Sequence, residues 1–244
     1  MAKFGQSDDL QGAEFAEANL KGARFVECDL SGVVMRGIDI QAGDIDAPWL
    51  AEEGASLKIN GINVAPYVQA ELNRQFPGRG DRRAADPDGL RAAWAAAERA
   101  WTATQERAAS MPEGSVDVSI DGEWSFADTQ RHLVHATDLW FGRSILGREE
   151  LHPLGLGYTG GNYVGQSGKP PYDEVLQARA DRVAMVRDFL ATVTPAELDT
   201  PRTNPHGPHP ETTRSCLHVI LGEEWEHLRF ATRDLDTIAA GEPG

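Results

Sequence analysis

Four long stretches of the chain place apolar residues at the spacing of a helix. They follow Asp86, Ser125 and Pro171, and the last begins near Glu211. Within each stretch the apolar residues recur three or four positions apart, so they share one helix face. The stripes are Leu90, Trp94, Ala97 and Trp101; Phe126, Leu133, Ala136 and Trp140; Leu176, Val183, Val186, Leu190 and Val193; and Leu217, Leu221, Leu228, Leu235 and Ile238. With no strand pattern between them, the sequence predicts a mainly α protein built on a four-helix bundle.

Ahead of residue 50, the apolar residues follow a period of five instead. Small residues such as Ala13 and Ala18 stand two positions before most of the large ones. The large residues are Leu10, Phe15, Leu20, Phe25, Leu30, Met35, Ile40 and Ile45. This pattern resembles the pentapeptide-repeat family, whose chains wind a right-handed, four-sided β-helix. Such a stretch makes about two coils, fewer than a solenoid usually needs to bury a continuous face, so we expect it to depend on the rest of the protein.

Between the repeats and the bundle, a short segment predicts a hairpin followed by a helix. Apolar and polar residues alternate on both sides of Asn60-Gly61, a pair that accepts the positive φ angles of a tight turn. Residues 67–76 have the spacing of a short amphipathic helix, and the charged run 77–83 marks a boundary. We therefore predict a pentapeptide-repeat segment at 1–50, a hairpin and helix connector at 51–85, and the bundle at 86–244. Two long Gly- and Pro-rich connections in the bundle are expected to act as pocket walls.

Composition and charge narrow the range of functions. With 23 Lys and Arg against 38 Asp and Glu, the formal net charge is −15, which repels phosphate backbones, so we expect no nucleic-acid partner. No run reaches the roughly 18 apolar residues of a membrane span, and the N-terminus lacks the apolar core of a secretion signal. Cys28 and Cys216 lie in different predicted parts, so we expect a cytoplasmic protein without a disulfide framework. Cys28 is interpreted as a small core residue.

The fourth helical stretch contains one pair of side chains that suits a metal ion. Glu223 and His227 are four residues apart, so they lie one turn apart on the same helix face. Alone, the pair also fits an ordinary solvated face, and it needs a third ligand from a facing helix. The second stretch offers His132 and His135, and spacing does not choose between them. His218 should face away from the pair, so we expect it to be structural.

Four short runs resemble the DinB superfamily, which includes the metal-binding domain of mycothiol-dependent maleylpyruvate isomerases. The runs are GEWSF at 122–126, RHL at 131–133, EEWEH at 223–227 and RDL at 233–235, and the resemblance extends over 86–240. Members are four-helix bundles that bind a divalent metal through a His on the second helix and a pair on the fourth. The resemblance implies His132, Glu223 and His227 as ligands. It favours His132 over His135 because the family's His stands shortly after a Trp and just before a Leu.

The implied ligand set suggests which metal and which chemistry to expect. Two imidazoles and one carboxylate suit zinc, and the family also accepts nickel and other first-row metals. Three protein ligands leave room for water or a thiol, whose pKa a metal lowers. His135 and Asp128 could act as outer partners of His132 or as a proton relay. Arg229 and Tyr163 could contact a polar substrate, although a surface or core-edge role is the simpler interpretation of all four.

These observations lead to one preferred function and two alternatives. The resemblance implies a metal-dependent transferase or isomerase that uses a low-molecular-weight thiol of the mycothiol type and acts on a small molecule. The chain ends soon after the fourth stretch, without the extra domain of maleylpyruvate isomerases, so we expect S-transfer rather than isomerisation of maleylpyruvate. The alternatives are an interaction or stress-related module with a structural metal, and a metal-dependent hydrolase. A homodimer is compatible with each.

Overall fold

The computed structural model of the protein describes residues 3–5, 8–51, 54–159, 162–165 and 168–241, with the backbone alone described at 51, 158–159 and 162–165. The chain divides into two compact units, Met1–Ala47 and Pro48–Gly244. The predicted connector falls within the second unit, and the three-part division stays a prediction. Within the described ranges, no helix is both long and apolar enough to cross a membrane.

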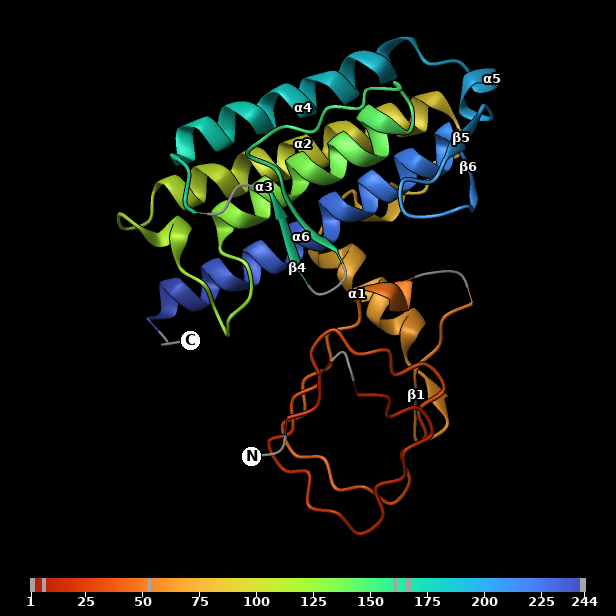
Figure 1. Cartoon of the computed structure of the whole chain (residues 1–244), viewed down its shortest axis with the longest axis vertical. Helices are drawn as coiled ribbons and strands as arrows, with labels where there is room; N and C mark the ends of the chain where they lie inside the picture. Colours follow the sequence, from red (N-terminus) through yellow and green to blue (C-terminus); the bar gives the residue numbers. More distant parts are fainter. Residues whose placement is uncertain (1–2, 6–7, 52–53, 160–161, 166–167, 242–244) are drawn as a thin grey trace. The chain divides into compact units, whose positions relative to one another are not determined.

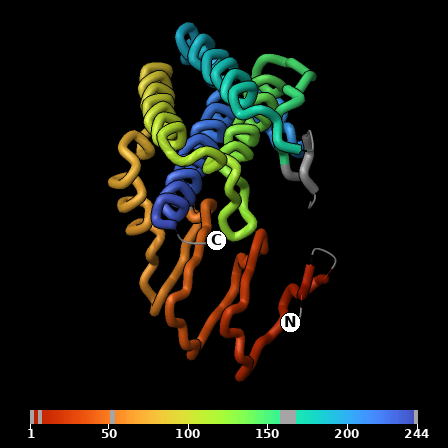
Figure 2. Tube along the Cα trace, turned by 90° about the vertical axis from the view of Figure 1, so that its left-hand side faces the viewer, coloured from red at the N-terminus to blue at the C-terminus, as the bar shows by residue number. Residues whose placement is uncertain are grey.

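Four long helices form the bundle (Figure 1). They are α2 (Pro87–Ala109), α3 (Phe126–Thr137), α4 (Tyr172–Thr192) and α6 (Thr213–Ala240). Both α2 and α3 contact α4 and α6, so the four helices close a ring around a shared core. Figure 2 shows them running alongside one another. The protein is therefore mainly α, with the four-helix bundle that the apolar stripes predict.

The bundle core consists of two clusters of buried apolar side chains. One includes Phe141 and the other includes Trp225, and both draw residues from several of the long helices. The predicted stripe is displaced by one residue at the start of α4, where Val175 is buried and Leu176 is partly exposed. The other stripes contribute to the core much as their spacing predicts.

Local hydrogen bonds explain where two of the helices begin. The Ser125 side chain accepts a hydrogen bond from the backbone N–H of Asp128 at the start of α3. Thr212 and Ser215 bond reciprocally as a capping box, so α6 begins slightly later than predicted. Beyond α3, the segment Asp138–Arg143 continues as a π-helical turn, a rare form that the apolar spacing did not indicate.

Three antiparallel hairpins and two short α-helices lie outside the long helices in the described part of the second unit. The strands pair antiparallel as β1 (Lys58–Ile59) with β2 (Ile62–Asn63), β3 (Leu156–Thr159) with β4 (Asn162–Gly165), and β5 (Pro201–Thr203) with β6 (Pro210–Thr212). The short helices are α1 (Ala65–Gln75) and α5 (Pro195–Leu198). The first hairpin and α1 agree with the predicted connector. The other two hairpins lie in segments predicted as loops, and β3 packs against α3.

The first unit is a four-sided coil (Figure 1). Positive φ angles recur every five residues, at Gly12, Glu17, Gly22, Glu27, Gly32, Gly37 and Ala42. These corners agree with the five-residue repeat of the sequence. Among the described residues of this unit, none lies in a ladder-bonded strand and all are exposed, including the large repeat residues such as Phe15. A coil of this length has too few stacked neighbours to bury its apolar positions.

The two cysteines differ in exposure and therefore in reactivity. Cys28 is exposed, so the expectation of a core residue was wrong, because the short coil does not cover that position. Cys216 is buried, and burial raises its pKa to about 12, so it carries almost no thiolate near neutral pH. We expect one thiol per folded chain to react rapidly with a thiol-specific disulfide reagent, and the second only after unfolding. A rapid phase that survives in Cys28→Ser would contradict this assignment.

Candidate metal centre

Three side chains from α3 and α6 converge in the second unit. His132 lies on α3, and Glu223 and His227 lie one turn apart on α6. The Glu223 Oε2 atom is 3.1 Å from His132 Nε2 and 3.2 Å from His227 Nε2. One ligand atom from each of the three residues lies within 4.8 Å of the others. The contact between α3 and α6 therefore brings together the three residues that the resemblance implies as ligands.

The environment favours the protonation states that a metal requires. Burial opposes ionisation of Glu223, but the close imidazoles of His132 and His227 outweigh it and hold the pKa of Glu223 well below its usual range. Burial lowers the pKa of His227, although the bond with Glu223 works in the opposite direction. An ionised carboxylate and neutral imidazole are the forms that bind metals. The three side chains stay 15–20% exposed, so solvent reaches the site.

A backbone carbonyl sets the orientation of His132. Its Nδ1 lies 3.1 Å from the carbonyl oxygen of Leu156 at the start of β3. Because a carbonyl only accepts hydrogen bonds, Nδ1 carries the proton, and in the neutral ring Nε2 presents a lone pair toward Glu223. A lone pair facing a carboxylate is unfavourable unless a cation or a second proton lies between them. The donor set therefore fits a cation.

Aromatic rings enclose the two imidazoles. The centroid of Trp124 lies 4.5 Å from that of His132 and 5.9 Å from that of His227. The centroid of the Phe230 ring lies 5.8 Å from that of His227. The sequence interpretation did not place either ring in the site, although Trp124 belongs to one of the runs that carry the family resemblance. The rings give the site a largely apolar wall, which strengthens electrostatic interactions inside it.

The predicted outer partners of His132 have other neighbours. His135 is buried beside β3, and burial lowers its pKa. Asp128 accepts hydrogen bonds from Ser125 Oγ at 2.9 Å and from Arg131 Nη1 at 3.1 Å. The hydrogen-bond partners of His132 are Leu156 and Glu223 instead.

The remaining candidates fall in different surroundings. Arg229 pairs with Glu226 at 3.1 Å, and its guanidinium lies 4.3 Å from the centroid of Phe230 beside the site. The backbone of Tyr163 is in β4, and its side chain lies outside the described residues. His218 Nε2 lies 2.9 Å from the carbonyl oxygen of Ala84, in keeping with a structural role.

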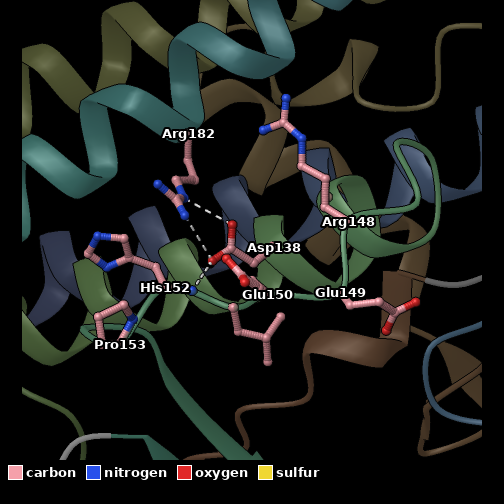
Figure 3. A pocket seen from close by; sticks show the side chains of 9 residues that line it. Asp138, Arg148, Glu149, Glu150, His152, Pro153 and Arg182 are labelled. Atoms are coloured by element: carbon pink, nitrogen blue, oxygen red, sulfur yellow. Dashed lines mark hydrogen bonds and ion pairs between the residues drawn. The ribbon is translucent and has the colours of Figure 1, made fainter.

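A separate hollow of about 580 Å³ lies beside the π-helical turn (Figure 3). Asp138 lies within it and pairs with Arg182 at 2.9 Å, while the backbone N–H of His152 donates to the same carboxylate at 2.7 Å. Charges of both signs line the hollow, and the ion pair between Asp138 and Arg182 is the one that joins two of its lining residues among the described contacts. The residues that line it are Asp138, Gly142, Arg148, Glu149, Glu150, Leu151, His152, Pro153 and Arg182. Since the three converging residues are not among them, we place the candidate chemistry at Glu223.

Comparison with known families agrees with this geometry. Residues 96–231 match the DinB superfamily, and residues 9–39 match pentapeptide repeats in eight copies. The first match covers more than half of the chain, so this protein belongs to the DinB superfamily, and it carries an N-terminal pentapeptide-repeat segment. No curated protein and no solved structure matches the chain.

The close approach of β3 to α3 leads to a test of the hairpin's packing. A Cβ atom at Gly157 would lie 2.3 Å from His135 Nε2. We therefore expect Gly157→Ala to destabilise the protein by about 1–3 kcal/mol, as overpacking does. Replacing His135 by Ala as well should remove most of this loss of stability, because the ring that the new methyl group meets is then absent. A double-mutant cycle, with the free energy of unfolding measured in urea, tests this expectation.

A helical glycine provides the control for this cycle. A Cβ atom at Gly222 on α6 meets nothing within 4 Å, so Gly222→Ala should leave stability unchanged or raise it by up to about 1 kcal/mol. If Gly157→Ala cost the same stability in the wild-type protein and in the His135→Ala variant, the proposed contact would be refuted.

Proposed function

We propose that this protein holds one divalent cation, with zinc the first candidate, through His132, Glu223 and His227, and that it catalyses thiol transfer to a small electrophilic molecule. The observation that carries the proposal is the convergence of two imidazole nitrogens and one carboxylate oxygen within 4.8 Å. Membership of a superfamily whose members often bind divalent metals supports it. Two nitrogen ligands and one oxygen ligand suit zinc, and nickel or another first-row metal fits the same set.

Each residue of the site has a separate role in the proposed reaction. His132, Glu223 and His227 hold the cation and leave coordination open toward solvent, as catalytic sites do. A cation held there lowers the pKa of a bound thiol or water. Trp124 and Phe230 cover parts of the imidazole faces and keep water from them. Arg229 lies over the Phe230 ring, which itself lies beside His227, so its guanidinium is placed to bind an anionic part of a substrate.

The thiol itself is proposed to come from a low-molecular-weight co-substrate. Cys216 is buried, with its pKa raised to about 12, so it does not supply a thiolate. A reducing cytoplasm is the proposed location, as expected for a chain with two cysteines in different parts of the sequence. A small-molecule substrate and a thiol of the mycothiol type therefore remain the proposed reactants.

The test begins with protein purified without an affinity tag. Elemental analysis should find about one divalent metal per chain, and the metal-loaded protein should accelerate transfer of a small thiol to monochlorobimane. His132→Ala should lose both properties. His209→Ala, on an exposed loop histidine, is the matched control and should keep both. Metal-free wild-type protein that also fails to bind added zinc would refute the proposal.

A second candidate is an interaction module with a structural metal. The large repeat residues of the first unit favour it, because they remain exposed and could be covered by a partner or a second copy of the chain. Stoichiometric metal without thiol or hydrolase turnover would favour this module, provided that removal of the metal unfolds the bundle. Turnover of esters or amides without a thiol would favour a metal-dependent hydrolase.

A further inference from the structure

One arginine ties both ends of the β3–β4 hairpin to α3. Arg131 is 3% exposed, and its Nε donates to the carbonyl oxygen of Leu154 at 3.0 Å. Its Nη1 donates to the carbonyl oxygen of Gly168 at 3.2 Å. Leu154 precedes β3, and Gly168 follows β4. A single guanidinium therefore holds the two ends of the hairpin at a fixed distance from the helix, which its planar set of donors allows.

The hairpin in turn supplies the acceptor that orients His132. Leu156 is two residues beyond the clamped Leu154, and its carbonyl oxygen lies 3.1 Å from His132 Nδ1. The side chain of Leu156 is buried, so the strand start is packed as well as hydrogen-bonded. Arg131 and His132 are consecutive on α3, and both bond to the same segment from the same helix turn. The guanidinium and the ring of His132 therefore bond to backbone carbonyls two residues apart in the same segment.

The guanidinium is itself oriented from the start of α3. Asp128 Oδ1 accepts a hydrogen bond from Arg131 Nη1 at 3.1 Å, and Asp128 Oδ2 accepts one from Ser125 Oγ at 2.9 Å. Ser125 is also the residue that caps α3, so the helix start and the hairpin share one set of hydrogen bonds. Asp128 therefore contacts the neighbour of His132 rather than His132 itself.

We infer that Arg131 is a positioning residue of the metal centre: it holds the β3–β4 hairpin so that the Leu156 carbonyl fixes the ring of His132 with Nε2 toward Glu223. The inference rests on the proposed metal binding. A hydrogen-bond acceptor on the second ring nitrogen fixes the tautomer of a ligating histidine and raises its basicity. Without the guanidinium, the carbonyl moves and His132 loses its fixed partner, although all three ligands remain in the chain.

The test compares Arg131→Met and Arg131→Lys with Arg202→Met. Met keeps a long side chain without donors, and Lys keeps the charge but not the planar set of donors. Arg202 is the matched control, because it also donates to a loop carbonyl, that of Ile145 at 3.0 Å, and to Thr213 Oγ1 at 2.8 Å. If Arg131→Met does not fold, Asp128→Asn replaces it in the test, because Asp128 pairs with Arg131 and its side chain is partly exposed. The same two measurements are then made on that variant.

Two readings are taken, zinc affinity by chelator competition and the imidazole Nδ1–H proton of His132 by NMR of zinc-loaded protein. We expect Arg131→Met to weaken zinc binding by about 10–100-fold, the usual cost of losing an outer partner. Its Nδ1–H proton should exchange freely with water, whereas wild type and Arg202→Met keep it protected. Arg131→Lys should fall between them.

The possible outcomes separate this inference from the proposed function. Wild-type affinity and a protected Nδ1–H in Arg131→Met would overturn the positioning role alone. The same loss in Arg202→Met would also overturn it, because the effect would then be general destabilisation. A wild-type protein that binds no zinc would overturn the proposed function and this inference together.

Discussion

Glu223→Gln is expected to lower zinc affinity by more than about 100-fold, beyond the usual cost of losing an outer partner. The carboxylate contributes the negative charge of the ligand set, and its Oε2 atom lies between both imidazoles. An amide of the same shape keeps the packing but offers the cation only a neutral oxygen. Chelator competition measures the affinity, and circular dichroism shows whether the helices remain intact.

Glu98→Gln on α2 is the matched control for this substitution. The Glu98 side chain is 22% exposed, close to the 20% of Glu223, and it pairs with Arg187 instead of with histidine. Glu98→Gln therefore makes the same change of charge at a similar exposure, and we expect it to leave zinc affinity unchanged. A Glu223→Gln protein that still binds zinc as tightly as Glu98→Gln would show that the carboxylate is not a ligand.

The bundle was predictable because each long helix carries its own periodic signal. The stripes on α2, α3 and α6 need no knowledge of the partner helix, since burial of one face follows from spacing alone. The β3–β4 hairpin was missed for the opposite reason. Its strands are four residues long, and Gly157 reads as a turn or loop residue in the sequence. In the structure that glycine allows the strand to approach the ring of His135.

The candidate site was predictable only in part from the residues themselves. The spacing of Glu223 and His227 indicates a shared face, but His132 and His135 are three apart on α3, and tertiary packing decides which of them faces α6. The family resemblance favoured His132, and the structure brings that ring to Glu223. Its assignment as a metal ligand stays a prediction. The partner of Nδ1 is the backbone carbonyl of Leu156, a group that every residue carries, so the sequence contains no signal for it.

Glu224→Gln should have the largest effect on the stability of the bundle. Glu224 is next to the candidate ligand, yet its carboxylate faces the core, where it is hydrogen-bonded to Arg179 of α4. Both side chains are at most 3% exposed. Removing one partner of a buried ion pair leaves an uncompensated charge and costs about 3–5 kcal/mol. For a protein of this size we expect the Tm to fall by on the order of 10 °C, measured by calorimetry.

The double substitution of Arg179→Met with Glu224→Leu distinguishes a charge effect from a packing effect. Apolar residues of similar volume remove both charges and leave no unpaired group, so most of the lost stability should return. Glu98→Gln, which breaks an ion pair to a largely exposed Arg187, should cost about 1 kcal/mol or less. If the double variant were as unstable as Glu224→Gln, the pair would stabilise the bundle through its shape and hydrogen bond. Zinc affinity in the double variant should stay close to wild type, because Glu223 is unchanged and keeps both imidazole neighbours.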